Sequence, residues 1–285
     1  MRERATKQEI KEREEFIYAY AEEHKPVTVR QLFYAATVSK IVGITKDEAG
    51  YGKIQRIAHR MRVEYALPHW WIADHNRTVW GLDTYSNINK AAEEWERSFR
   101  LDFWAKREEK VEVWLEKSAL ASSLAPVTQE YRVDLFPTAG FASEGFVEKA
   151  VRDAHSEGKT KLYVYSLYDF DQAGQTASNA LQKAIYRLTD FYSLELEYCA
   201  LGLNAKQVES WNIPTRQPKR KSSNDKLWPY SIAAELDAIP ITTLRNHLRK
   251  RLGEHLPYKE RGRLLDQETT QRARLSMALY DLYDD

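Results

Sequence analysis

The sequence predicts a multidomain α/β protein, α+β overall, in which a helical amino-terminal region precedes a parallel-sheet domain and a helical extension. Between residues 110 and 201, short apolar segments alternate with amphipathic ones, the pattern of strands joined by crossover helices. Upstream, three segments repeat their apolar residues with a helical period. Glu116, Asp169 and Asp171 follow two of the apolar segments, where the strands of an open α/β sheet gather their working groups.

Composition places the chain among proteins with a sizeable core and a polar surface. Its 285 residues suffice for one large domain or two modest ones, and 43% are hydrophobic. No apolar run approaches the length of a membrane span, and the start, Met1 to Arg4, does not look like a secretory signal. The single cysteine, Cys199, excludes an intramolecular disulfide and is expected to be a buried small hydrophobe. We therefore expect a cytoplasmic protein.

The amino-terminal region, residues 1–86, is expected to form a winged helix-turn-helix domain that binds DNA. A charged helix is predicted at 7–24, and Thr28 is a good N-cap for a second helix. A third helix at about 49–65 carries a buried stripe of Ile54, Ile57, Ala58 and Met61. Two short strands, at 70–74 and 78–80, would form the wing after these three helices.

The rest of the chain divides into a connector, a sheet domain and an extension. Residues 87–109, rich in aromatic side chains, predict one connecting helix between the domains. The sheet domain, 110–203, has predicted strands at 110–116, 132–137, 161–168 and 194–201, separated by helices at 118–130, 144–157 and 174–190. The extension, 204–285, is predicted to contain an exposed loop at 212–230 and helices at 229–236, 241–255 and 266–283.

Three carboxylates at the ends of two strands point to a metal site. Glu116 ends the first strand, and Asp169 and Asp171 follow the third. Grouped carboxylates repel one another and are costly to bury unless a cation joins them. Because the set contains oxygen ligands without His or Cys, it favours Mg²⁺ over zinc, with Mn²⁺ as a substitute. Taken singly, each acid is also typical of a solvated turn or a helix N-cap.

The pattern of these acids resembles the Toprim domain shared by topoisomerases, primases and some nucleases. In that family the Glu and the two Asp bind Mg²⁺ beside a DNA phosphate, and here the matching residues are Glu116, Asp169 and Asp171. Gly140, after the second strand, matches the glycine of the family's central turn. Gln172 stands where proline is frequent, at a position that is not a ligand. The resemblance covers about residues 110–200.

A second resemblance lies upstream, in the sequence Thr28-Val29-Arg30-Gln31-Leu32-Phe33-Tyr34. It is similar to the tyrosine motif of the topoisomerase VI A subunit and its meiotic double-strand-break relatives, most closely the compact "mini-A" type. The resemblance implies that Tyr34 is the nucleophile and that Arg30, four residues earlier on the same helix face, holds the scissile phosphate. Tyr51 is an alternative nucleophile that fits the motif less well. Seventeen tyrosines make a packing role the ordinary expectation for any one of them.

What the family resemblance implies about assembly goes beyond these motifs. In type IIB topoisomerases the tyrosine and the metal act across a dimer, so a homodimer is expected here. The chain has no Gly-rich phosphate-binding loop of the ATPase kind, and strand passage would need a separate ATPase subunit of the GHKL type. Association with DNA implies a nucleoid-associated location within the cytoplasm.

Basic residues outside the carboxylate trio are candidates for DNA contacts. Because the net charge is only +1, such contacts must come from local patches. Lys53, Arg56 and Arg60 recur on one face of the third helix, although a solvated helix face explains them equally well. The remaining candidates are Lys117, beside Glu116, and the loop residues Lys219, Arg220 and Lys221. Glu235 and Asp237 resemble a further acidic segment of the family, which would make them an additional acidic contribution to the site; of the two roles we expect them to cap and solvate a helix.

The expected function is Mg²⁺-dependent DNA cleavage by tyrosine transesterification, with a homodimer making double-strand breaks. Two alternatives remain open. One is a hydrolytic Toprim nuclease that uses metal-activated water, in which Tyr34 is structural. The other is a DNA-binding plasmid or phage factor without catalysis.

Overall fold

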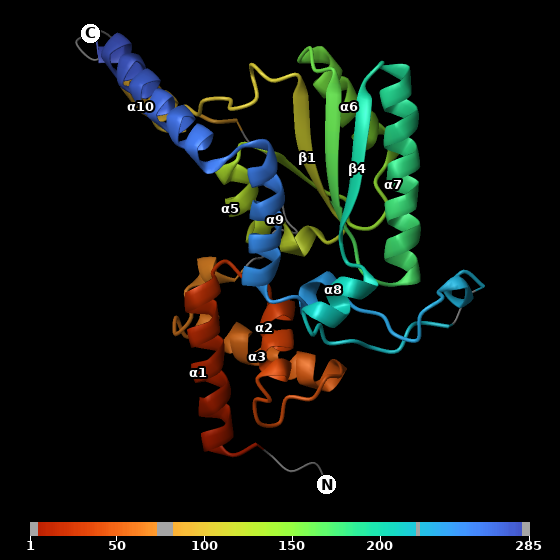
Figure 1. Cartoon of the computed structure of the whole chain (residues 1–285). Coiled ribbons are helices and arrows are strands. Elements are labelled where there is room, and N and C mark those ends of the chain that lie inside the picture. The colour runs from red at the N-terminus through yellow and green to blue at the C-terminus, as the bar shows by residue number, and fades with distance from the viewer. Residues whose placement is uncertain (1–4, 73–81, 221–222, 281–285) are drawn as a thin grey trace.

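The protein is a mixed α/β structure around a four-stranded parallel sheet (Figure 1). The computed structural model describes residues 5–72, 82–220 and 223–280. The strand order is β2-β1-β3-β4, so the two strands that precede the predicted carboxylates, β1 and β3, are neighbours in the middle. The strands are β1 Glu109–Leu115, β2 Asp134–Pro137, β3 Lys161–Leu167 and β4 Glu195–Gly202. The predicted strands are confirmed to within two residues at each end.

The faces of the sheet are covered by two pairs of helices, because successive side chains of a strand point to opposite sides. In β1, Val111, Val113 and Leu115 belong to the core cluster that contains residues of α5 and α9. Trp114 belongs to the second cluster, which is formed with residues of α6 and α7. These helices are α5 Ala121–Glu130, α6 Glu144–Ser156, α7 Gln172–Phe191 and α9 Ile241–His255.

Three helices, α1 Lys7–His24, α2 Val29–Val38 and α3 Glu48–Val63, form the amino-terminal region, as the sequence predicts. Thr28 is the N-cap of α2 in a reciprocal capping box: its Oγ1 accepts from the Gln31 amide, and the Gln31 carboxamide accepts from the Thr28 amide. The Ser123 hydroxyl of α5 donates to the same Gln31 oxygen at 3.2 Å. The start of α2 is therefore fixed directly against the sheet domain.

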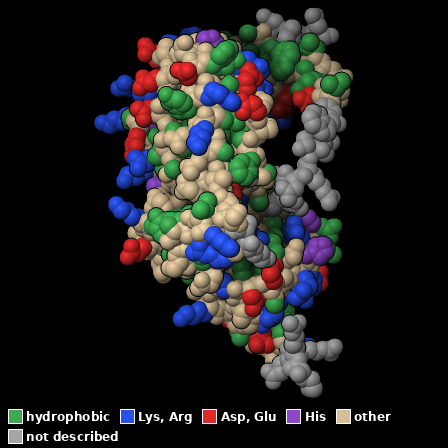
Figure 2. All heavy atoms as spheres, turned by 90° about the vertical axis from the view of Figure 1, so that its right-hand side faces the viewer, with side chains coloured by type: hydrophobic (Ala, Val, Ile, Leu, Met, Phe, Trp, Pro, Cys, Tyr) green, Lys and Arg blue, Asp and Glu red, His purple; other side chains and the backbone are tan. Residues whose placement is uncertain are grey.

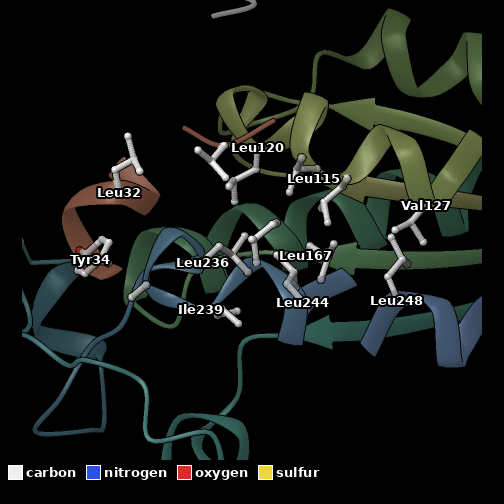
Figure 3. Packing of buried hydrophobic residues seen from close by; sticks show 14 of the residues in the cluster. Leu32, Tyr34, Leu115, Leu120, Val127, Leu167, Leu236, Ile239, Leu244 and Leu248 are labelled. Atoms are coloured by element: carbon white, nitrogen blue, oxygen red, sulfur yellow. The ribbon is translucent and has the colours of Figure 1, made fainter. Parts of the chain in front are cut away.

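One continuous apolar core joins the amino-terminal helices to the sheet. The same cluster contains Ile17 and Leu32 from the amino-terminal helices, Leu115 and Leu167 from the sheet, and Leu244 from α9. Figure 3 shows these layers, with α2 at one end and the strands and α9 at the other. The carboxyl edge of the sheet consequently faces α2 in a fixed orientation.

Residues after β4 differ most from the sequence prediction. The loop from 212 is confirmed, but 229–236 is not a helix: Ala233 and Ala234 form isolated bridges with Arg216 and Phe170. The final helix begins eight residues earlier than predicted, and Figure 1 shows it projecting from the body of the protein. The elements are α8 Ala205–Ser210, the 3₁₀ turns η3 Asp225–Leu227 and η4 Leu236–Ala238, and α10 Tyr258–Tyr280.

Two further predictions in the first half of the chain are wrong. Instead of a strand at 70–74, a 3₁₀ turn, η1 His69–Trp71, is followed by a single bridge between Ile72 and Val27, and residues 73–80 of the predicted wing lie outside the described residues. The predicted connector helix at 87–109 ends early, since α4 spans only Ile88–Ser98. The backbone amide of Leu101 instead donates to the carboxylate of Glu268, and that of Trp104 donates to the carboxylate of Asp102. Among the described residues, no helix is both long and apolar enough to cross a membrane.

Candidate active site

A cavity of about 620 Å³ lies where the carboxyl edge of the sheet meets the amino-terminal helices. Glu116, Asp169 and Asp171 all line it, as the sequence predicts. The opposite wall comes from α2 and α3 and includes Arg30 and Tyr51. The remaining charged residues of the wall are Arg62, Lys117, Arg216, Lys219, Glu235 and Asp237.

Glu116 continues the sheet one residue past β1. Its amide donates to the Leu167 carbonyl at 2.9 Å, and its Oε2 accepts from the Asp169 amide at 2.8 Å. Burial raises the pKa of the Glu116 carboxyl, and the nearby Asp171 and Glu235 act in the same direction. The first acid of the trio is thus hydrogen-bonded to the backbone of the second.

The turn after β2 closes against Glu116. The amide of Gly140 donates to the Glu116 carbonyl at 3.2 Å, and Thr138 donates to the Leu115 carbonyl at 2.8 Å. Gly140 has a φ of +101°, a conformation that side-chain-bearing residues rarely adopt. The glycine singled out in the sequence therefore has a backbone reason to be there, next to the site.

Asp169 and Asp171 follow β3 in an extended segment that turns into α7. Asp171 is the N-cap of α7: its Oδ1 accepts from the Gly174 amide at 2.8 Å. Its Oδ2 contacts Nη2 of Arg216 at 2.6 Å. The capping role that an isolated Asp would have is thus real here, and it leaves the second oxygen of Asp171 on the cavity.

Asp169 is held by the segment before α9, for which the sequence favoured a capping role over a contribution to the site. Phe170 and Ala234 exchange two backbone hydrogen bonds of 2.9 Å, and the Leu236 amide donates to Asp169 Oδ1 at 2.8 Å. This bridge brings Glu235 and Asp237 to the cavity wall. Burial raises the pKa of Asp169, and Glu116 adds to the rise.

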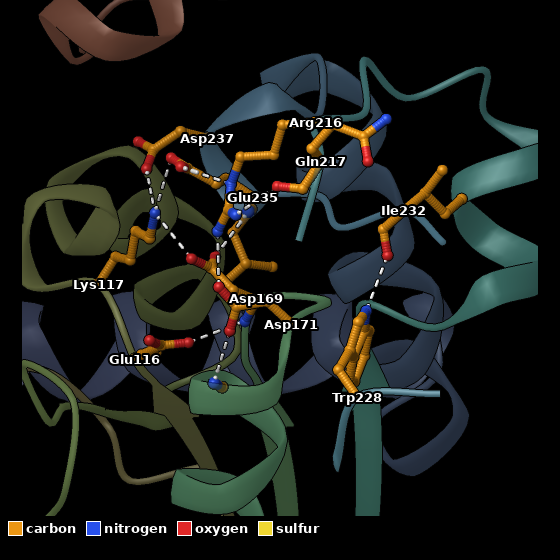
Figure 4. Close-up of polar contacts among 12 residues, drawn as sticks. Glu116, Lys117, Asp169, Asp171, Arg216, Gln217, Trp228, Ile232, Glu235 and Asp237 are labelled. Atoms are coloured by element: carbon orange, nitrogen blue, oxygen red, sulfur yellow. Dashed lines mark hydrogen bonds and ion pairs between the residues drawn. The ribbon is translucent and has the colours of Figure 1, made fainter. Parts of the chain in front are cut away.

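The expectation that Glu235 and Asp237 cap and solvate a helix is wrong. Both belong to an ion network around Lys117, whose Nζ lies 2.9 Å from Asp169, 3.1 Å from Asp237 and 3.2 Å from Glu235 (Figure 4). Asp237 is only 2% exposed, and burial raises the pKa of its carboxyl. For Glu235, burial is outweighed by Lys117 and Arg30, which lower its pKa to about 2. The alternation of acids at 235 and 237 was the available signal.

Arg30 connects α2 to this network. Its Nη1 donates to Glu235 Oε2 at 2.8 Å, a contact between residues 205 positions apart. The guanidinium also lies over the ring of Tyr51, 5.1 Å from the centroid. Arg30 therefore lies at the carboxylates of its own chain, and the predicted role of Arg30 at a phosphate stays a prediction.

The side chain of Tyr34 is buried, whereas a nucleophile must be accessible to the phosphate that it attacks. Tyr34 is 7% exposed, belongs to the apolar core and does not line the cavity (Figure 3). Burial, reinforced by Glu235, raises the pKa of its hydroxyl to about 12, while Arg30 and Lys117 act in the opposite direction. These charges belong to the cavity network, so the Tyr34 side chain lies near the network without opening onto the cavity. Tyr51 is the tyrosine on the wall.

The basic residues predicted for DNA contact do not share one surface. Lys53, Arg56 and Arg60 line a separate depression of about 320 Å³ with Arg13, between α1 and α3. Lys53 donates to the Gly43 carbonyl, and Arg60 pairs with Glu14. Figure 2 likewise shows a face on which basic, acidic and apolar side chains are interspersed.

In the extension loop, Lys219 lines the cavity at the carboxyl edge of the sheet, whereas the side chain of Arg220 is hydrogen-bonded within the loop. Arg220 donates to the carbonyls of Trp228 at 3.0 Å and Tyr230 at 3.2 Å. Lys221 lies outside the described residues. Arg216, which no sequence pattern singled out, joins Asp171 to Glu235 from the same loop.

The donor set fits a hard divalent cation, although cations of the chain itself occupy much of it. Five carboxylates face three bonded cations, Arg30, Lys117 and Arg216, and Asp237 Oδ1 is buried without a hydrogen-bond partner among the described residues. Oxygen ligands of this kind suit Mg²⁺ or Mn²⁺. In the described part of the chain, no three His, Cys, Asp or Glu side chains already stand in a metal-holding arrangement.

Comparison with known proteins found no relative of the chain. No protein-family model, curated protein or solved structure matches the chain.

Proposed function

We propose that the protein cleaves the phosphodiester backbone of DNA at this cavity, in a reaction that requires Mg²⁺ or Mn²⁺. The observation that carries the proposal is the meeting of five carboxylates with Arg30, Lys117 and Arg216 in one cavity of about 620 Å³. Pockets of this size hold small molecules or single groups of a polymer. The resemblance of the acid pattern to Toprim and of the upstream motif to the topoisomerase VI A subunit supports the same reading.

The residues of the chain would divide the work between binding and chemistry. Glu116, Asp169 and Asp171 would hold the divalent cation, which supplies positive charge beside the phosphate when bound. Arg30 and Lys219 on the wall offer hydrogen bonds to phosphate oxygens. A homodimer, two cut strands and a separate ATPase subunit are the further consequences of the topoisomerase resemblance.

In the tyrosyl mechanism, Tyr34 Oη attacks the phosphorus, the new O–P bond forms and the P–O3′ bond breaks. The tyrosine loses its proton to solvent and the leaving 3′ oxygen gains one. Because Tyr34 is buried in the middle of α2 and its hydroxyl has a raised pKa, this route needs α2 to move toward a substrate, either in its own chain or in a dimer partner.

The position of Tyr34 off the cavity wall favours a second candidate, hydrolysis by water at the same carboxylates. In this route Tyr34 is a packing residue, and the product carries no protein. Tyr51, beside Arg30 on the wall, remains a tyrosine that can contact the substrate.

Supercoiled plasmid incubated with the protein and Mg²⁺ or Mn²⁺, then treated with protease before electrophoresis, tests the proposal. Cleavage that Asp169→Asn abolishes supports the metal-dependent reaction. Covalent protein on DNA 5′ ends that disappears in Tyr34→Phe, but not in Tyr51→Phe, selects the tyrosyl mechanism. Full cutting by Tyr34→Phe selects hydrolysis. Absence of any cutting, with DNA binding retained, would instead favour the non-catalytic DNA-binding protein.

A further inference from the structure

Both aspartates of the candidate metal site are already neutralised by cations of the protein. Lys117 Nζ lies 2.9 Å from Asp169 Oδ2, and Arg216 Nη2 lies 2.6 Å from Asp171 Oδ2 (Figure 4). Asp169 and Asp171 line the same cavity as Glu116. A divalent cation that bound Asp169 and Asp171 would therefore compete with two side-chain cations for the same oxygens.

Lys117 is enclosed like a bound cation. Three carboxylates surround its ammonium within 3.2 Å, and these carboxylates raise the pKa of Lys117 despite its burial. One of them, Asp237, still has a buried oxygen without a hydrogen-bond partner in the described chain. Glu235 is shared with Arg30 and Arg216, so five carboxylates face three cations across the whole network. The buried Asp237 oxygen still lacks a donor among the described residues.

Arg216 is placed so that its release would change the loop as well. It spans Asp171 and, at 3.4 Å, Glu235, while its backbone exchanges hydrogen bonds with Ala233. One residue earlier, the Thr215 carbonyl accepts from Lys46 of the amino-terminal region. The loop thus connects both sides of the cavity at the point where the Arg216 side chain reaches Asp171.

Ammonium and guanidinium groups also bind phosphate well, and Lys117 and Arg216 both face the cavity. Each of them can exchange a carboxylate for a phosphate oxygen without leaving the wall. Such an exchange would free one oxygen of Asp169 and one of Asp171 as the phosphate arrives.

We propose that Lys117 and Arg216 are exchangeable counter-cations that couple the binding of metal to the binding of a nucleic-acid phosphate. Without nucleic acid they occupy Asp169 and Asp171 and keep divalent-cation affinity low. A backbone phosphate takes them over and releases the two carboxylates to the metal. This inference rests on the proposed function and names the residues that regulate its site. Linkage requires the reciprocal effect, so metal must strengthen DNA binding by the same factor.

The test is direct measurement of Mn²⁺ affinity on the full chain, by electron paramagnetic resonance of the free ion, with and without a short DNA duplex. In the unaltered protein, DNA should tighten Mn²⁺ binding by about 5- to 150-fold, the usual range of coupling between sites. Lys117→Met and Arg216→Gln should each bind Mn²⁺ tighter without DNA and lose part of the enhancement by DNA. Lys161→Met is the matched control, because Lys161 pairs with Glu195 at the start of β3, away from the cavity.

The outcomes separate this inference from the proposed function. If both variants keep the thermal unfolding of the parent and bind Mn²⁺ no tighter without DNA, the exchange is refuted, even where Asp169→Asn shows that the metal site exists. Equal Mn²⁺ affinity with and without DNA in the unaltered protein refutes it as well. If no form binds Mn²⁺, with or without DNA, the metal-dependent function fails together with the exchange. The two substitutions lie in separate segments, so one poorly folded variant leaves the other to decide.

Discussion

Glu112 should make the stability of the protein fall as the pH rises through the neutral range. This residue lies in the middle of β1 with none of its surface exposed. Its Oε2 accepts from Trp114 Nε1 at 2.8 Å, and its Oε1 has no hydrogen-bond partner among the described residues. Burial raises the pKa of its carboxyl from 4.5 to about 7, because the charged form is poorly solvated in the core.

The size and sign of the effect follow from linkage. Between pH 4.5 and 7 the folded protein binds a proton at Glu112 that the unfolded chain has lost, so the free energy of unfolding falls as pH rises. A difference of about 2.5 pKa units corresponds to about 3 kcal/mol. Stability from this residue is complete below pH 4.5 and lost above pH 7.

The substitution that isolates this effect is Glu112→Gln, which keeps an acceptor for Trp114 but does not titrate. Urea unfolding of both proteins between pH 4.5 and 8.5 should give a difference in unfolding free energy that changes by about 3 kcal/mol in favour of the variant as pH rises. Because other buried acids titrate equally in both proteins, they cancel in the difference. Parallel stability curves for the two proteins across this range would refute the argument.

Three further predictions concern the site and its surroundings. A Cβ at Gly174 would lie 2.4 Å from the Asp169 carbonyl oxygen, so Gly174→Ala should lower the free energy of unfolding by about 2–4 kcal/mol and abolish metal-dependent cleavage of DNA. The control is Gly145→Ala, at a similar place in α6 with open space around it, which should be neutral or stabilising in thermal unfolding. Arg220→Gln removes the hydrogen bonds of Arg220 to the loop carbonyls and should speed cleavage of the loop by a protease. An unchanged rate of loop proteolysis would contradict the structural role of Arg220. If the depression lined by Lys53, Arg56 and Arg60 binds DNA, Arg56→Gln should reduce the slope of log DNA affinity against log salt concentration by about one phosphate contact, measured by filter binding. An unchanged slope would exclude Arg56 from the DNA contact.

The strands and their carboxylates were predictable because local pattern determines them. Apolar runs near 110 and 161 and the acids after them place Glu116 and Asp169 at one edge once the strands are parallel neighbours. The role of Thr28 as an N-cap was equally predictable from the sequence, since capping depends on residues three positions apart. The prediction of Mg²⁺, of DNA and of a homodimer stays a prediction.

The errors arose where distant contacts override local preference. Residues 229–236 read as a helix, yet Ala234 pairs with Phe170, 64 positions away. The same pairing carries Glu235 and Asp237 to Asp169; the alternation of the two acids was visible in the sequence, but their long-range partner was not. Arg216 lies in a loop with Pro and Gln neighbours, and only the folded structure shows it at Asp171. For Tyr34, the motif made the residue a candidate nucleophile but could not show that its side chain is buried.

The contact between Arg30 and Glu235 determines how late in translation the candidate site can be completed. The two residues are 205 positions apart, so at about 5–20 residues per second the ribosome adds Glu235 some 10–40 s after Arg30. Until then the growing chain can present Glu116, Asp169 and Asp171, but Lys117 and Arg30 lack Glu235, and Asp169 lacks the Leu236 amide. Incomplete products of translation would therefore carry the acids without the finished cavity. A protein proposed to cut DNA would gain that ability only near the end of its synthesis.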